Sequence, residues 1–149
     1  MLTPTDARTA ASLIRRTFRA IEVPLDPPPS ALRVTAADVL AGLAQGGGAA
    51  WDDQGLRGCV LWHPKHGGLY LGRLAVAPEW QGRGIARALI AAAEAAARHG
   101  GLDRLLLEVR LPLTGNRRLF ATCGFIETAL RCHPGHTSPT FTEAEKRLR

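Results

Sequence analysis

A glycine-rich segment between an apolar strand and a long helix holds the residues best suited to binding an anion. Residues 78–86 read Pro-Glu-Trp-Gln-Gly-Arg-Gly-Ile-Ala, and an alanine-rich helix is expected to follow. The first N–H groups of a helix lack partners within it and lie at the positive end of its dipole, so they attract groups such as pyrophosphate. Gly82 and Gly84 have no Cβ, which would let a bulky anion approach the backbone.

The spacing of these residues differs from that of the commoner phosphate loops. A P-loop requires Lys and then Ser or Thr after its second glycine, whereas Gly84 is followed by Ile85 and Ala86. A dinucleotide-binding fingerprint requires a third glycine that is missing here. What remains is Gln81-x-x-Gly84-x-Ala86, which comes directly after a strand that ends in Val-x-Pro.

This pattern resembles the acetyl-CoA-binding signature of the GNAT N-acetyltransferase superfamily, Arg/Gln-x-x-Gly-x-Gly/Ala. A second motif follows, in which Asn116 begins a short helix that leads to Gly124 and Phe125. The two motifs stand in the family's order with one strand between them. The resemblance is strongest over residues 69–125 and extends towards the C-terminus.

The resemblance implies a mixed α/β (α+β) fold in one domain over residues 1–149. Its central sheet would be mostly antiparallel, with a splayed pair of parallel strands and helices on both faces. The implied activity is that of an acetyl-CoA-dependent N-acetyltransferase. In such an enzyme a primary amine of a small molecule or peptide attacks the thioester directly in a ternary complex.

The resemblance also implies where acetyl-CoA would bind. The strand ending at Val76 would carry a bulge, and backbone groups of Leu74 and Val76 would pair with the pantetheine and the acetyl carbonyl. Amides of residues 82–86 would hold the pyrophosphate, with charge added by Arg83 and Arg87. The expected acetyl-CoA-binding residues are Leu74, Ala75, Val76, Gln81, Gly82, Arg83, Gly84, Ile85, Ala86, Arg87, Asn116 and Phe120.

Simpler interpretations of several of these residues remain open. Arg83 and Arg87 could form an ordinary solvated helix face. Asn116 could act only as a helix N-cap, which is the usual role of Asn before a helix. Cys123 is interpreted as a packing residue, because no base is placed beside it by the sequence.

The groups that would move protons are the least defined part of the pattern. Many members of the family use a tyrosine on the second-motif helix as general acid, whereas the matching position here is Phe120. The only tyrosine in the chain is Tyr70, in the preceding strand. Glu108 in the central strand and His133 in a late loop are the candidate bases chosen from a set that also contains Glu79 beside the glycine-rich segment and His136 in the late loop. An alternative is therefore a catalytically weak or inactive CoA-binding module that acts as a sensor or partner subunit.

The elements that would position these residues follow from hydrophobic periodicity and turn signals. Helices are expected over residues 5–19, 35–44, 84–99 and 116–122. Strands are expected over residues 49–53, 56–62, 69–76, 104–110, 125–132 and 140–148. Strands 69–76 and 104–110 flank a helix and should be parallel neighbours. The strand that usually opens the family fold is short or absent, which leaves a sheet edge for a homodimer.

Composition and charge indicate which partners and which cellular location to expect. The net charge of +6 suits a phosphorylated ligand, and the basic residues form no run interleaved with aromatics, so a nucleic-acid partner is not favoured. The three cysteines show no disulfide framework or metal spacing, and no metal is expected. No apolar stretch is long enough to cross a membrane, and no signal peptide is evident, so a cytoplasmic location is expected.

Overall fold

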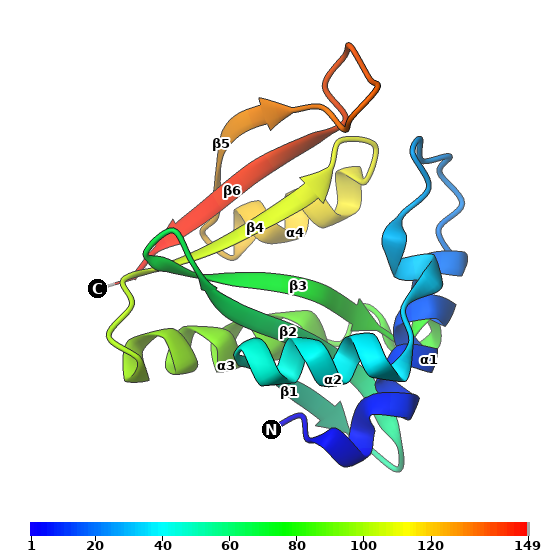
Figure 1. The fold of residues 1–149 in the computed structure, drawn as a ribbon, viewed down its shortest axis with the longest axis vertical. Coiled ribbons are helices and arrows are strands. Elements are labelled where there is room, and N and C mark those ends of the chain that lie inside the picture. The colour runs from blue at the N-terminus through cyan, green and yellow to red at the C-terminus, as the bar shows by residue number, and fades with distance from the viewer. Residues whose placement is uncertain (149) are drawn as a thin grey trace.

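The computed structural model describes residues 1–148 and places the strands of that range in one six-stranded sheet (Figure 1). The strands, in sheet order, are β1 (Gly47–Asp52), β2 (Leu56–Lys65), β3 (Gly68–Val76), β4 (Arg104–Arg110), β6 (Phe141–Arg147) and β5 (Ile126–Arg131). Neighbouring strands are antiparallel except β3 and β4, which are parallel. The expectation of a mostly antiparallel sheet with one parallel pair is confirmed.

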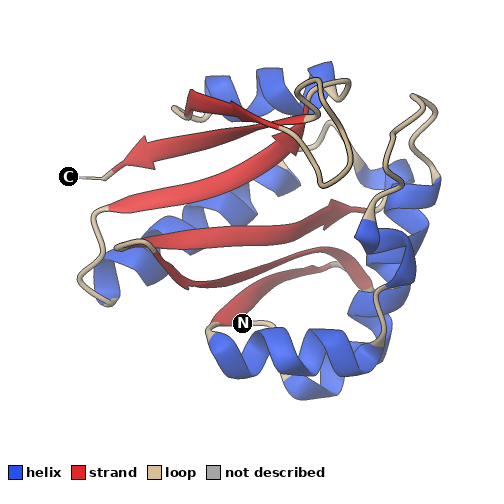
Figure 2. Ribbon diagram, turned by 45° about the horizontal axis from the view of Figure 1, so that its top comes forward, coloured by secondary structure: helices blue, strands red, loops and turns tan. Residues whose placement is uncertain are grey.

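Helices cover both faces of this sheet (Figure 2). They are α1 (Ala7–Arg19), α2 (Ala36–Gln45), α3 (Ile85–His99) and α4 (Thr114–Thr122), with the short 3₁₀ turns η1 (Pro4–Asp6), η2 (Ser30–Arg33) and η3 (Pro78–Trp80). Side chains alternate between the faces of a strand. On β2, Cys59 faces the core under α1 and α2, whereas the next residue, Val60, faces the core under α3. The sheet is thus the middle layer between two hydrophobic cores.

A bulge interrupts β3 where it passes Val60 of β2. Cys59 pairs with Ala75, but Leu61 pairs with Gly72, so β3 carries one extra residue between these two pairs. Arg73 lies in this bulge with a φ of +55°, a conformation that residues other than glycine rarely adopt. The bulge expected near the end of this strand is therefore present.

Strands β3 and β4 separate after a short paired region. Their ladder holds Leu69 opposite Leu105 and Tyr70 opposite Leu106, and the two strands then diverge towards their C-terminal ends (Figure 1). Backbone groups of β3 beyond the paired region are thereby released from the ladder with β4. The expected splay of the parallel pair is confirmed.

Within the described residues, no strand comes before α1, and α4 begins earlier than expected. The first strand of the described chain is β1, so no strand precedes α1, and Leu2 N–H donates a single bond to Gly48 O at 3.0 Å. Helix α4 begins at Thr114, two residues before the expected start. Its N-cap position is Leu113, which places Asn116 inside the first turn. The interpretation of Asn116 as an N-cap is therefore wrong.

Candidate functional site

A cavity of about 650 Å³, which we call the α3 cavity, lies where the end of β3, the loop before α3, the end of α1 and the start of α4 meet. Most of the expected acetyl-CoA-binding residues line it: Leu74, Val76, Gln81, Gly82, Gly84, Ile85, Ala86, Arg87, Asn116 and Phe120. Residues that the sequence did not indicate complete its wall, among them Thr17 and Phe18 of α1. The fold thus brings together two motifs that lie about thirty residues apart in the chain.

The glycine loop has the open backbone that an anion would need. Gly82 and Gly84 have φ values of +80° and +81°, and a Cβ built on either would meet no atom within 4 Å. Helix α3 makes its first helical hydrogen bond from Ala88 N–H to Gly84 O at 3.1 Å. The N–H groups before Ala88 are the orphan donors of a helix N-terminus. These features fit a pyrophosphate group.

The carbonyl of Val76 is already held by two side chains. Gln81 Nε2 donates to it at 3.1 Å, and Thr17 Oγ1 donates to it at 3.4 Å. The expectation for Val76 was that its backbone groups contact acetyl-CoA; its carbonyl has an internal role, because it joins β3, the glycine loop and α1. No pattern in the sequence indicates these hydrogen bonds to the Val76 carbonyl, because they form only in the folded structure.

The two arginines near the loop differ in their surroundings. The guanidinium of Arg83 lies over the ring of Trp80, with its Cζ 4.5 Å from the ring centroid, and it does not line the α3 cavity. Arg87 does line the cavity, and its Nη2 donates to Thr122 Oγ1 at 2.7 Å. Ala75 is also outside the cavity, since its side chain is buried in the core under α1 and α2.

Phe120 forms an apolar part of the cavity wall. Its ring is buried and packs edge-on against Phe125, with centroids 5.8 Å apart. It offers no hydroxyl for proton transfer. At this position α4 therefore contributes an apolar wall to the cavity and no general acid.

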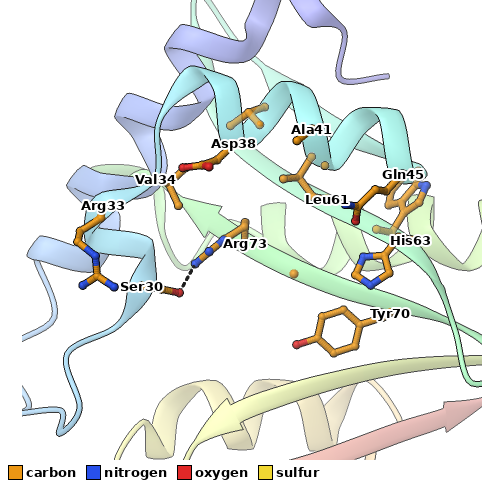
Figure 3. Close-up of a pocket in the computed structure, with 14 residues that line it drawn as sticks. Ser30, Arg33, Val34, Asp38, Ala41, Gln45, Leu61, His63, Tyr70 and Arg73 are labelled. Atoms are coloured by element: carbon orange, nitrogen blue, oxygen red, sulfur yellow. Dashed lines mark hydrogen bonds between the residues drawn. The ribbon is translucent and has the colours of Figure 1, made fainter.

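Two further cavities are each lined in part by β3. One of about 650 Å³ lies beside α2 and is called the α2 cavity (Figure 3); one of about 410 Å³ lies against β4 and is called the β4 cavity. They share the lining residues Ser30, Arg33, Tyr70 and Arg73. Phe18 lines both the β4 cavity and the α3 cavity. The three spaces are thus neighbours around α1 and the splayed strands.

Both candidate bases lie in the lining of the β4 cavity, together with Tyr70. Burial raises the pKa of Tyr70 to about 12, and the nearby Glu108 carboxylate acts in the same direction. Desolvation lowers the pKa of His133, with Arg110 and His136 adding to the effect, while Glu108 opposes it. At neutral pH the tyrosine is therefore a protonated donor and the imidazole a neutral acceptor.

Two loops enclose the far side of the β4 cavity. The ring of His133 packs edge-on against Phe141, with centroids 4.9 Å apart. In the same loop His136 Nε2 lies 3.6 Å from Asp26 Oδ1, and Arg110 Nη2 donates to the carbonyl of Pro27. The proline-rich segment after α1 and the β5–β6 loop are therefore joined across this end of the sheet.

Within residues 1–148, no cluster of three or more His, Cys, Asp or Glu side chains could hold a metal ion. None of the helices in that range is long and apolar enough to span a bilayer.

The sequence model of the acetyltransferase (GNAT) family matches residues 14–125, which include both motifs and the lining of the α3 cavity. This chain belongs to the GNAT family. It is an N-acetyltransferase by that membership, and no curated protein sequence matches it well enough to specify more.

Solved structures support the same fold. PaiA N-acetyltransferase from Thermoplasma acidophilum, in complex with coenzyme A, is similar with a TM-score of 0.81 at 18% identity, over 99% of this chain and 96% of that one. Ribosomal-protein-S18-alanine N-acetyltransferase from Escherichia coli gives 0.77 at 18% identity, over 99% and 90%. An acetyltransferase from Bacillus subtilis, in complex with CoA, gives 0.63 at 18%, over 74% and 82%. Two of these three structures, the Thermoplasma acidophilum and Bacillus subtilis proteins, hold coenzyme A.

Proposed function

We propose that this GNAT protein transfers the acetyl group of acetyl-CoA to a primary amine of a small molecule or peptide by direct attack in a ternary complex. The observation that carries the proposal is the junction at Phe18, where the α3 cavity and the β4 cavity share a wall. A thioester held in the first cavity and an amine held in the second would meet beside the splayed ends of β3 and β4. Such alignment supplies much of the rate enhancement that a two-substrate transfer needs.

The α3 cavity has surfaces that would suit the pyrophosphate and the pantetheine of the donor. N–H groups of residues 82–86 would bind the pyrophosphate at the start of α3, and Arg87 would add charge. The backbone of Leu74, freed by the splay, would pair with the pantetheine arm. When bound, acetyl-CoA supplies a thioester whose carbonyl carbon accepts an amine.

The β4 cavity offers the groups that would handle the proton of the amine. An ammonium cannot attack, so one proton must leave before the C–N bond forms and another during its formation. The Glu108 carboxylate would take a proton directly or through a water molecule, and the neutral His133 lines the same cavity. We therefore assign the base to Glu108 and a positioning role to His133.

One observation favours the alternative of a weak or inactive CoA-binding module. Phe120 occupies the place at which many members of the family carry an acidic tyrosine, and it cannot protonate the departing thiolate. A CoA thiolate is a good leaving group, so water can fulfil that need. Turnover with an amine panel separates the two functions, because a binding module would hold acetyl-CoA and release no thiol.

The first experiment is calorimetry of acetyl-CoA with the unmodified protein, Gly84→Trp and Gly101→Trp. Both glycines have positive φ values and open space at the Cβ position, but Gly101 follows the C-cap of α3 and lies outside the α3 cavity. The two variants therefore carry a similar backbone strain of about 1–2 kcal/mol. We expect Gly84→Trp alone to abolish binding. Equal loss in both variants, or no binding by the unmodified protein, would refute the assignment.

A further inference from the structure

The lining of the β4 cavity carries more positive than negative charge. Arg33, Arg73 and Arg110 contribute guanidinium groups, whereas Glu108 contributes the one carboxylate among its lining residues. An amine acceptor alone would not favour such a surface, because its ammonium form is repelled by cations. The excess of positive charge indicates a second, anionic group on the molecule that binds here.

Arg110 has the clearest unmet hydrogen-bonding need. Its Nη2 donates to the carbonyl of Pro27, but its buried Nε–H has no acceptor within the described part of the chain. A buried N–H without a partner costs free energy, and a guanidinium suits a planar oxyanion that accepts two bonds at once. The Asp26 carboxylate acts on the Arg110 guanidinium by its charge, but it is 89% exposed and its Oδ1 lies 3.6 Å from His136 Nε2.

Within residues 1–148, neither Arg73 nor Arg33 forms an ion pair with a carboxylate. Arg73 Nη1 donates to the neutral Ser30 Oγ at 3.0 Å (Figure 3). The Asp38 carboxylate acts on Arg73 by its charge, but it accepts from Thr35 N–H at 2.9 Å and Thr35 Oγ1 at 3.0 Å in the cap of α2. Arg33 is exposed at the shared edge of the α2 and β4 cavities.

The spacing along β4 sets the length of the ligand. Glu108 and Arg110 are alternate residues of one strand and face the same side, so their backbones lie about 7 Å apart. An amine beside Glu108 and an oxyanion beside Arg110 would be joined by only a few bonds. A cavity of about 410 Å³ suits a group of this size.

We propose that the acceptor of this enzyme is a small amine that also carries an oxyanion a few bonds away, with the amine at Glu108 and the oxyanion at Arg110. This inference rests on the proposed function, because it names the acceptor class of the same site. A carboxylate and a phosphate share the necessary chemistry. Amino acids and aminoalkyl phosphates are the two sources to be distinguished.

The test begins with binding, which requires no turnover. The CoA-saturated protein is heated with three pools at millimolar concentration: the standard amino acids, their carboxamides and aminoalkyl phosphates. We expect one of the oxyanion pools to raise the midpoint of unfolding and the carboxamides to leave it unchanged, because only a bound ligand stabilises the fold. Equal shifts with the acids and the amides, or no shift with any pool, would overturn the inference.

Variants then locate the oxyanion. Arg110→Gln should lose the shift given by the oxyanion pool, whereas Arg118→Gln, which removes the same charge from the exposed surface of α4, should keep it. If Arg110→Gln does not fold, the comparison of acids with amides in the unmodified protein still decides. Retention of the shift in a folded Arg110→Gln variant would refute the placement.

Turnover is measured separately by release of the CoA thiol. The active oxyanion amines should exceed their neutral counterparts in kcat/KM by about tenfold or more. Turnover of neutral amines alone would refute the inference and leave the proposed function intact. A shift with an oxyanion pool and no thiol release from any amine would refute the proposed function and support the anion site.

Discussion

Gln81 Nε2 donates a hydrogen bond to the carbonyl of Val76 at 3.1 Å. The bond spans the turn between the end of β3 and the glycine loop, two segments that would contact different parts of acetyl-CoA. Gln81 stands at the first position of the Gln-x-x-Gly-x-Ala motif. The amide group of Gln81 suits this position, because its N–H donates to the Val76 carbonyl and so holds the glycine loop against the end of β3.

Replacing Gln81 by alanine should loosen the glycine loop and leave the fold intact. A single hydrogen bond of this kind contributes about 1 kcal/mol to the free energy of unfolding. We expect the Kd of acetyl-CoA, measured by calorimetry, to rise severalfold. Gln54→Ala in the β1–β2 turn is the control and should leave the Kd unchanged. An unchanged Kd in Gln81→Ala would contradict this role.

Arg87→Ala should weaken acetyl-CoA binding far more than Arg83→Ala. Arg87 lines the α3 cavity, and a charged hydrogen bond to a phosphate contributes about 1.5–3 kcal/mol, which is about ten- to a hundredfold in Kd. Arg83 is stacked on Trp80 outside the cavity, so its loss should change the Kd by less than about threefold. Calorimetry on the two variants measures the difference, and similar losses would show that Arg83 leaves its stack on binding.

Glu108→Gln should lower kcat/KM by about 10²–10⁴-fold, the usual contribution of a general base. Its Kd for acetyl-CoA should stay the same, because Glu108 does not line the α3 cavity. His133→Asn should cost much less than Glu108→Gln if the imidazole only positions the substrate. Steady-state kinetics with an accepted amine provides the measurement. A larger loss in His133→Asn would transfer the role of base to the histidine.

The pair of Arg117 and Glu127 should make stability depend on pH. Arg117 Nε and Nη2 donate to the two carboxylate oxygens at 2.9 Å and 2.8 Å, which lowers the pKa of Glu127 below its ordinary value. A depressed pKa in the folded state contributes stability above the unfolded pKa of about 4.3, and this contribution is lost as the pH falls through the folded value.

Urea unfolding of Glu127→Gln tests this dependence. The two side chains are 32% and 38% exposed, so solvent screening limits the pair to about 0.5–1 kcal/mol at neutral pH. We expect that deficit near neutral pH and its disappearance at strongly acidic pH. A double-mutant cycle with Arg117→Met isolates the pair. A deficit of the same size at both extremes would show that the effect does not come from ionisation.

Much of the fold followed from local signals. The strand from Arg104 to Arg110 was predicted at its observed bounds, because its apolar run is short and bounded by turns. In the last strand the residues from Glu143 to Lys146 favour a helix by propensity. Pairing on both sides overrides that preference, as β6 lies between β4 and β5 and buries Thr142 and Ala144. Pairing with strands that are distant in the sequence cannot be predicted from neighbouring residues alone.

The candidate site divides in a similar way. The glycine loop was predictable because its chemistry lies within a few consecutive residues. The roles of Arg73 and Arg110 were not, because each depends on a partner far along the chain: Ser30 for the first and Pro27 for the second. The sequence alone does not distinguish Arg83 from Arg87. In the structure Arg83 stacks on the Trp80 ring, whereas Arg87 lines the α3 cavity. Spacing thus indicated the loop proposed for the pyrophosphate, whereas only the fold defines the cavity proposed for the amine.

Because Phe18 lines both cavities, a substitution there should change the specificity for the acetyl donor and for the amine acceptor together. One aromatic ring on α1 borders the space proposed for the acetyl donor and the space proposed for the acceptor. A substitution there that admits a bulkier amine also reshapes the wall of the donor pocket, so its benefit depends on which residues already stand opposite. Adaptation to new acceptors should therefore proceed through epistatic pairs of changes that include α1, rather than through independent single steps.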